Sequence, residues 1–310
     1  MTDCKVNTVS FQLKPVPPFR LDLTAWALRR RANNIVDRWD RQCYRRVLTA
    51  EKKPLEISVT QPDKKKPLLH VTVEGSGIGP DARLAAEASL RKLLGTGIEL
   101  SAFYIFARND PRLRPIALRF RGLKPPQFPT AFEAAANAIA CQQISLNVGI
   151  VILNRLITAY GRSLTVRDRT SHAFPLPEDL AEAKPETLRD LGFSRQKALA
   201  LIELSQKISD GTVDLEMLKY MDDETAREHL HELRGIGRWS ADYILLRGLG
   251  RIHIFPADDV GGRNRLQRLL ALKKPLDFEG TRRIIERWRP YGGLIYFHLL
   301  LKGLEEEKVL

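Results

Sequence analysis

The sequence has 310 residues, 44% of them hydrophobic, so the chain can bury a substantial core divided over two or three units. A formal net charge of +13 favours a polyanionic partner. Three widely spaced cysteines, Cys4, Cys43 and Cys141, argue against a disulfide framework, and no apolar run has the length of a membrane span. Because the N-terminus also has no apolar signal segment, we expect a cytoplasmic location, on the nucleoid.

The first 120 residues have a mixed pattern. Clusters of β-forming residues predict strands at 10–13, 44–48, 55–59 and 68–73, and three lysines followed by a proline at 64–67 predict a hairpin tip. Helices are predicted at 23–37 and 80–94, and the second has Pro80 in its first turn and Gly95 just past its end. This part is therefore predicted to be a small α/β N-terminal domain, residues 1–120.

From Pro125 onward the apolar spacing is helical throughout. Thr130 followed by Glu133 predicts a capping box, and prolines in 119–128 suggest the linker. The sequence therefore predicts an all-α domain over residues 121–310. Its helices are expected at 130–140, 146–160, 177–183, 185–191, 194–208, 222–233, 238–249, 260–271, 279–288 and 292–303.

One stretch of this helical part carries a glycine turn that opens a helix. Gly235 and Gly237 allow a turn with positive φ, and Ile236 between them can enter a helical core. The bare N–H groups at the N-terminus of the helix beginning near Arg238 are suited to an anion, and a DNA phosphate is the natural occupant. A turn of this kind also joins many helices without binding anything, so the residues around it decide whether an anion site is predicted.

Two carboxylates, Asp258 and Asp259, follow the turn by a little over twenty residues. Together with flanking motifs this arrangement resembles the helix-hairpin-helix DNA glycosylases, most of all the bacterial 3-methyladenine DNA glycosylase II group. The resemblance covers nearly the whole chain, and it rests on residues 235–239 (GIGRW), Tyr243, 246–248 (LRG), 255–256 (FP) and 259–260 (DV), and also on 131–133 (AFE), 142–145 (QQIS), 288–290 (WRP) and the N-terminal segment from 18 to 46.

The resemblance implies that Asp259 is the catalytic residue, because it stands 24 residues after Gly235. A carboxylate near the anomeric carbon stabilises the sugar cation that forms when an N-glycosidic bond breaks. Asp258 is then expected to cap the next helix. The alternative is that both carboxylates serve only at the helix N-terminus, where Asp is common.

The residue two positions after Gly237 bears on the reaction type. Relatives that also cut the strand have a lysine nucleophile there, whereas this chain has Trp239, which implies a monofunctional enzyme that uses water. Trp239 and Tyr243 share a helical face and are expected to contact a flipped base, which suits a cationic alkylated purine. By a looser match, Trp26 is a third pocket aromatic. Core packing is the alternative for all three.

Other roles follow from the resemblance alone. Gln143 stands where the family inserts a side chain into the gap left by the flipped nucleotide, and Leu300 replaces a pocket tryptophan of some members. The backbone carbonyls of His231, Leu233 and Ile236 would hold a sodium or potassium ion. No zinc, nucleotide or flavin motif is present, so no other cofactor is expected.

The sequence thus predicts a monomeric DNA glycosylase of base excision repair. It would hydrolyse the N-glycosidic bond of alkylated purines, of the 3-methyladenine and 7-methylguanine type, in double-stranded DNA, with no membrane partner. Gly235, Gly237, Arg238 and Gln143 are the expected DNA contacts. The alternatives are a glycosylase for oxidised or deaminated bases, and a helix-hairpin-helix protein that binds DNA without catalysis.

Overall fold

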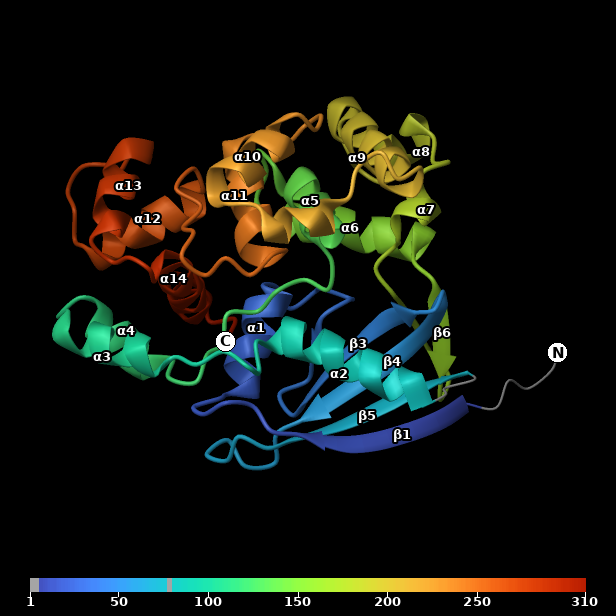
Figure 1. Ribbon diagram of the computed structural model, residues 1–310, viewed down its shortest axis with the longest axis horizontal. Coiled ribbons are helices and arrows are strands. Elements are labelled where there is room, and N and C mark those ends of the chain that lie inside the picture. Colours follow the sequence, from blue (N-terminus) through green and yellow to red (C-terminus); the bar gives the residue numbers. More distant parts are fainter. Residues whose placement is uncertain (1–5, 77–79) are drawn as a thin grey trace.

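A computed structural model describes residues 6–76 and 80–310. A sheet with one long helix across it lies below a larger group of helices (Figure 1). The predicted fold class, a small α/β part followed by a helical part, is confirmed. The elements of the first part are β1 (Val6–Leu13), α1 (Leu21–Arg29), β2 (Arg38–Trp39), β3 (Cys43–Ala50), β4 (Lys53–Thr60), β5 (Leu69–Ser76), α2 (Pro80–Leu94), α3 (Ser101–Asn109) and α4 (Leu113–Arg119).

The five-stranded sheet is antiparallel, with the strand order β1-β5-β4-β3-β2. Val73 of β5 pairs with Val9 of β1 on one side and with Ile57 of β4 on the other. Alternate residues of the central strands, such as Val71 and Val73, are buried, and leucines of α2 join the same core. The helix predicted at 80–94 is confirmed, and the segment 64–67 lies in the β4–β5 connection as predicted.

The second part is mostly helical. Its elements are α5 (Ala131–Cys141), α6 (Leu146–Tyr160), β6 (Ser163–Val166), β7 (Arg169–His172), α7 (Pro177–Leu180), α8 (Pro185–Asp190), α9 (Arg195–Ser209), a 3-10 helix η1 (Leu215–Tyr220), α10 (Asp223–His231), α11 (Arg238–Arg247), α12 (Val260–Leu269), α13 (Phe278–Glu286) and α14 (Gly292–Glu306). The alanines of α5 are completely buried, which lets α11 pack closely on it.

Three departures from the expected elements have local causes. The first helix ends at Arg29, not Asp37, because Arg30 adopts φ +61°. Helices α3 and α4 lie in a segment for which no helix was predicted. The β6–β7 hairpin interrupts the part expected to be all helical, and it turns through positive φ at Arg167 and Asp168.

A buried ion cluster joins the two parts. Arg46 of β3 is 1% exposed and donates to Asp37 at 2.8 Å and to both carboxylate oxygens of Glu133 on α5. The Thr130 side chain accepts from the Glu133 backbone N–H as predicted. The Glu133 carboxylate, however, bonds to Arg46, so the reciprocal half of the predicted capping box is absent.

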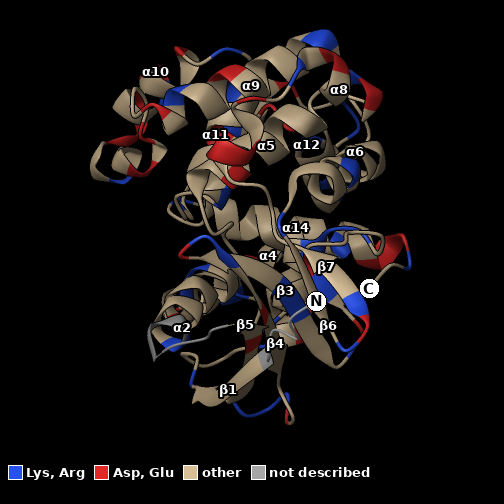
Figure 2. Ribbon diagram, turned by 90° about the vertical axis from the view of Figure 1, so that its right-hand side faces the viewer, with Lys and Arg blue, Asp and Glu red and all other residues tan. Residues whose placement is uncertain are grey.

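One hydrophobic core draws on both parts of the chain. It combines Leu23 and Ala27 of α1, Phe103 of α3 and Phe120 with Leu266 of α12 and most of the apolar residues of α14. The boundary at residue 120 stays a prediction. Within 6–76 and 80–310, no helix has the length and apolar character needed to cross a bilayer. Lys and Arg residues occur along both parts of the chain (Figure 2).

Burial of His298 in this core makes the stability of the fold depend on pH. Its ring lies against Phe103, and burial lowers the His298 pKa from 6.5 to about 4. The unfolded chain therefore binds a proton between these values that the folded chain does not. We expect the free energy of unfolding to fall by about 3 kcal/mol as pH drops from 6.5 to 4 on this account. Urea titrations of the wild type and His298→Leu across that window measure it, and equal losses in both proteins would contradict the expectation.

Candidate active site

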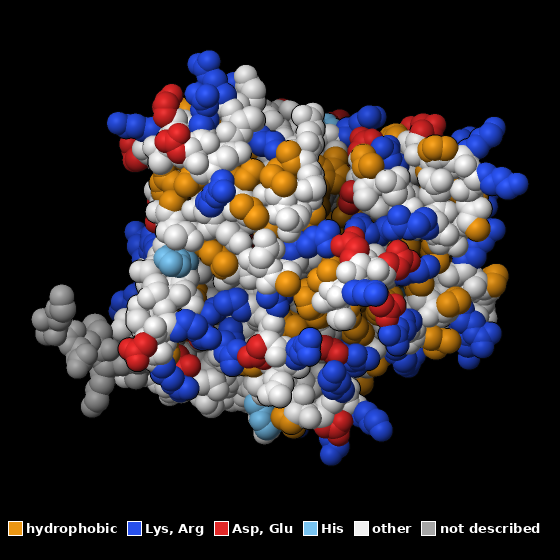
Figure 3. Space-filling model, turned by 180° about the vertical axis from the view of Figure 1, so that it is seen from behind, with side chains coloured by type: hydrophobic (Ala, Val, Ile, Leu, Met, Phe, Trp, Pro, Cys, Tyr) orange, Lys and Arg blue, Asp and Glu red, His pale blue; other side chains and the backbone are white. Residues whose placement is uncertain are grey.

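A cavity of about 770 Å³ opens in the helical part, where residues from the beginning of this part of the sequence face residues from its C-terminal end. It is lined by the end of α1, the loop after α5, the start of α11, the segment before α12, and α14. Side chains of both polar and aromatic character face it, among them Arg30, Gln143, Trp239, Tyr243, Arg247, Asp259, Tyr296 and Leu300. Seen from behind, the molecule shows basic side chains over much of its surface, with hydrophobic side chains exposed between them (Figure 3).

The glycine turn joins α10 to α11. Gly235 has φ +78°, and a Cβ there would come within 2.8 Å of the Ala200 Cβ, so the turn requires glycine. Ile236 is 6% exposed and enters the helical core as predicted. Gly237 is the N-cap of α11 in extended geometry, is exposed, and has open space where a Cβ would lie.

Side chains from two other elements hold this turn. Gln142 donates to the Gly235 carbonyl at 2.7 Å and to the Ser240 hydroxyl at 2.8 Å. Lys197 of α9 in turn donates to the Gln142 carbonyl at 2.6 Å. The N–H groups at the start of α11 are therefore presented on a rigid, exposed turn, which is the arrangement that binds phosphate.

Asp259 is the N-cap of α12 and also lines the cavity. Its Oδ1 accepts from the Gly261 N–H at 2.9 Å, and the Tyr296 hydroxyl donates to its Oδ2. Burial, together with the neighbouring carboxylate, raises the pKa of Tyr296 well above its usual value, so the phenol remains a donor. Both carboxylate oxygens are thus held in place, and the helix N-terminus favours their negative charge.

The expectation that Asp258 caps the helix was wrong. Asp258 instead forms an ion pair with the exposed Arg238 at 3.0 Å and lies 3.8 Å from the guanidinium of Arg263. Asp259 is the N-cap instead, because it is the last residue with an extended backbone before α12 begins. Asp259 is therefore both the N-cap of α12 and the predicted catalytic residue.

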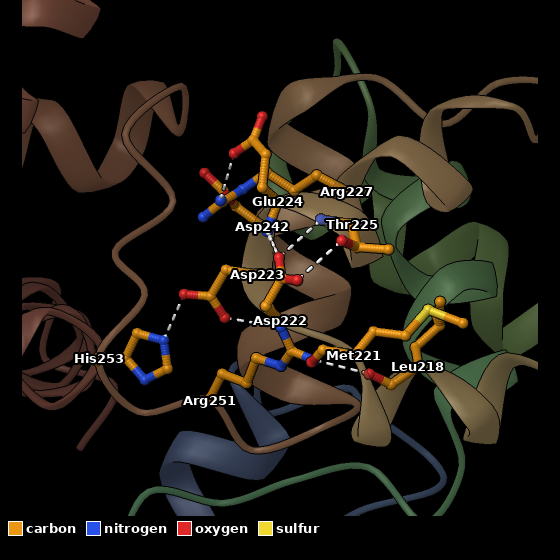
Figure 4. Close-up of polar contacts among 10 residues, drawn as sticks. All are labelled: Leu218, Met221, Asp222, Asp223, Glu224, Thr225, Arg227, Asp242, Arg251 and His253. Atoms are coloured by element: carbon orange, nitrogen blue, oxygen red, sulfur yellow. Dashed lines mark hydrogen bonds and ion pairs between the residues drawn. The ribbon is translucent and has the colours of Figure 1, made fainter.

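A polar cluster anchors the segment that leads to Asp259 (Figure 4). Asp223, at the start of α10, accepts from Arg251 and His253, both at 2.7 Å. Arg251 also donates to two carbonyls near the end of η1, and Arg227 of α10 pairs with Asp242 of α11 at 2.9 Å. The turn and the loop carrying Asp259 are thus tied to the same helix, which fixes their relative position.

Two of the three expected pocket aromatics lie in the cavity. The rings of Trp239 and Tyr243 are 5.4 Å apart and tilted by 35°, and Arg30 donates to the Tyr243 hydroxyl at 2.9 Å. Trp26 is not among the lining residues. It is partly buried between two hydrophobic cores, under the guanidinium of Arg29, and this packing keeps it out of the cavity.

Gln143 is exposed at the cavity rim and has φ +53°, in a sharp bend between α5 and α6. Ile144 beside it is 38% exposed. On the turn, the Leu233 carbonyl accepts from the Ile236 N–H, whereas the carbonyls of His231 and Ile236 accept no hydrogen bond from the described residues. Those oxygens fit a monovalent cation. No cluster of His, Cys, Asp or Glu in 6–76 and 80–310 could hold a metal.

Among the lining residues that were not predicted from the sequence as part of the site are Arg30, Arg31, Arg247 and Tyr296. Arg247 belongs to the LRG motif, Arg30 and Arg31 directly follow α1, and Tyr296 lies in α14, whose apolar spacing gave no sign of a polar role. Leu300, already identified at the position of a family tryptophan, lines the cavity too.

Comparison with known proteins places these features in a family. A family model described as "HhH-GPD superfamily base excision DNA repair protein" matches residues 136–290, half of the chain. A DNA-3-methyladenine glycosylase of Bacillus subtilis is 29% identical over 65% of this chain and 66% of its own length. DNA-3-methyladenine glycosylase 2 of Escherichia coli is 33% identical over 57% of this chain and 60% of its own length. The matched regions thus span less than two thirds of either relative.

Solved structures agree in fold. A 3-methyladenine DNA-glycosylase from Archaeoglobus fulgidus superposes with a TM-score of 0.83 at 26% identity, covering 94% of this chain and 97% of that one. An 8-oxoguanine glycosylase/lyase of Clostridium acetobutylicum, in complex with DNA, has a TM-score of 0.74 at 17% identity, covering 98% of each chain. The predicted resemblance is confirmed: the chain belongs to the HhH-GPD superfamily of base excision DNA repair proteins.

Proposed function

We propose that this protein is a DNA glycosylase that hydrolyses the N-glycosidic bond of alkylated purines in duplex DNA. The observation that carries the proposal is the Asp259 carboxylate, fixed by the Gly261 N–H and the Tyr296 hydroxyl beside a cavity of about 770 Å³. The names of the relatives support the same substrate class. We place the enzyme in the cytoplasm, on the nucleoid, as a monomer.

The chemistry follows from the position of Asp259. When the bond between C1′ and the base breaks, positive charge develops on the deoxyribose, and a fixed carboxylate stabilises it and orients water. Alkylation makes the purine a better leaving group, so no dedicated acid is required. Trp239 and Tyr243 present ring faces that favour a positively charged base.

Duplex DNA would bind over the turn between α10 and α11. The N–H groups around Gly235, Gly237 and Arg238 suit a phosphate, and the exposed Gln143 can occupy the gap that a flipped nucleotide leaves. The carbonyls of His231, Leu233 and Ile236 would hold a sodium or potassium ion that bridges to the phosphate.

We further propose that the enzyme is monofunctional. Trp239 occupies the position of a lysine nucleophile, and no lysine is among the residues that line the cavity in the described chain. Water is then the nucleophile, and the product is an abasic site in an intact strand.

One experiment tests both statements. We expect incubation with methylated duplex DNA to release methylpurines, identified by chromatography, and borohydride to trap no covalent adduct. Binding of duplex DNA without any base release would instead favour a non-catalytic DNA-binding protein. A trapped adduct in good yield would contradict the monofunctional assignment.

A further inference from the structure

The cavity has an excess of hydrogen-bond donors without partners. Five of its side-chain nitrogens are buried and bond to nothing in the described chain: Nε of Arg30, Nε of Arg31, Nε1 of Trp239, and Nε and Nη2 of Arg247. The carboxylate of Asp259, by contrast, is not short of partners, because both of its oxygens already accept hydrogen bonds. Since buried polar groups are nearly always paired, these nitrogens indicate a ligand that supplies acceptors.

Arg247 is the most deeply buried of these residues. It is 1% exposed, and among the described residues the only hydrogen bond of its guanidinium runs from Nη1 to the Ala27 carbonyl at 3.1 Å. The guanidinium lies over the rings of Phe128 at 4.8 Å and Phe297 at 5.2 Å. Burial lowers the pKa of Arg247, yet a guanidinium begins so high that it stays protonated.

No carboxylate among the described residues forms an ion pair with Arg247 or with its neighbour in the cavity, Arg30. The contrast is Arg46, equally buried, whose two Nη nitrogens are both paired, with Asp37 and Glu133, although its Nε also has no partner. A buried charge without a partner is costly to the fold. The aromatic rings account for the position of the Arg247 guanidinium, but they leave Nε and Nη2 without acceptors.

We propose that Arg247 recognises the flipped base by donating to a carbonyl oxygen on its inner edge, so that the cavity favours purines with oxygen at C6. The inference rests on the proposed function and narrows its substrate class. 7-Methylguanine and hypoxanthine carry this oxygen. 3-Methyladenine carries an amino group at C6. That group is itself a hydrogen-bond donor, so it cannot accept from Arg247, and the free N–H groups of the guanidinium would stay unpaired.

7-Methylguanine satisfies both features of the cavity. Its positively charged imidazole ring can lie against Trp239 and Tyr243, while its C6 oxygen accepts from Arg247. The guanidinium also assists bond breakage. As the C1′–N9 bond breaks, its electron pair stays on the purine and spreads to the C6 oxygen, where a fixed positive charge stabilises it. Water bonds to C1′ and loses its proton to solvent by way of Asp259.

The test uses duplex DNA treated with dimethyl sulfate, which contains 7-methylguanine and 3-methyladenine in one substrate. We compare the ratio of their release rates in the wild type and in Arg247→Met, which keeps the unbranched apolar stem of the side chain, removes the guanidinium and leaves no carboxylate unpaired. We expect release of 7-methylguanine to fall at least about tenfold more than release of 3-methyladenine. Arg247→Lys, which keeps the charge but lacks the planar fork, should have an intermediate ratio.

Arg31→Met is the matched control. It removes a second positive charge at the same cavity, but Arg31 pairs with Glu307 at the rim. The control should leave the ratio of the two release rates unchanged, although both rates can fall through weaker DNA binding. Equal loss of both bases in Arg247→Met would overturn the inference and leave the proposed function standing. Failure of the wild type to release either base would instead refute the proposed function.

A measurement on the wild type keeps the inference testable if Arg247→Met does not fold. Free hypoxanthine and free adenine differ along one edge of the ring: hypoxanthine has oxygen at C6 and a hydrogen on N1, whereas adenine has an amino group at C6 and an unprotonated N1. We expect hypoxanthine to inhibit base release at concentrations at least about tenfold lower than adenine. Equal inhibition by the two bases would overturn the inference.

Discussion

Replacing Asp259 with asparagine is expected to lower the single-turnover rate of base release by about a hundredfold to a thousandfold, with DNA affinity nearly unchanged. Asparagine has nearly the same shape and is an equally good N-cap, so α12 should keep its start. Only the charge that stabilises the sugar cation is removed. The amide has one oxygen for the two donors from Gly261 and Tyr296, which predicts a small loss of stability, about 1 kcal/mol.

The matched control is Asp258→Asn. Asp258 forms its ion pair with an arginine that is largely exposed, and such pairs contribute little to stability. We expect this variant to retain base release within a few-fold of the wild type. Rates of release from methylated duplex and DNA affinity from fluorescence anisotropy provide both measurements. Full activity in Asp259→Asn with loss in Asp258→Asn would show that the other carboxylate is catalytic.

The second large effect concerns the turn. Gly237→Asp should weaken binding to every duplex by at least about tenfold, because it places a negative charge where a phosphate approaches. Gly237 is suited to this test because it has extended geometry and open space at its Cβ position. Asp is also a favourable N-cap, so α11 should be at least as stable as in the wild type.

Gly237→Asn separates charge from bulk. It has the same size and capping ability as the aspartate but no charge, so most of the wild-type affinity should remain. Affinities measured over a range of salt should show a shallower salt dependence for the aspartate variant than for the asparagine variant. If Gly237→Asp binds duplex as tightly as the wild type, the turn is only a structural connection.

The sequence predicted the elements whose signals are local. The strands, α2 and α6 follow from alternation, helical spacing and flanking Pro or Gly, and the buried Ile236 follows from its place between two glycines. The first helix was predicted too long because Arg30 turns the chain through positive φ without a glycine or proline to indicate it. The β6–β7 hairpin was not predicted for the same reason, since its turn has no glycine and Arg167 is an unusual residue at positive φ.

The site likewise contains some residues that local sequence signals predict and others that they do not. Asp259, Trp239 and Tyr243 belong to a contiguous motif, so their presence at one cavity could be predicted, although their roles stay predictions. The contact between Tyr296 and Asp259 joins residues 37 positions apart and arises only from packing of α14 on α12. Arg247 gave no local sign either, because an arginine at a helix end usually reaches solvent.

The buried contact of Arg46 with Asp37 and Glu133 has a consequence for how this protein can be divided. The family model begins at residue 136, after all three of these residues. A fragment cut at that boundary would lose the first five residues of α5 and the helix α1 that supplies Arg30 to the cavity. The segment that the family model matches is therefore shorter than the segment whose buried contacts and cavity depend on one another.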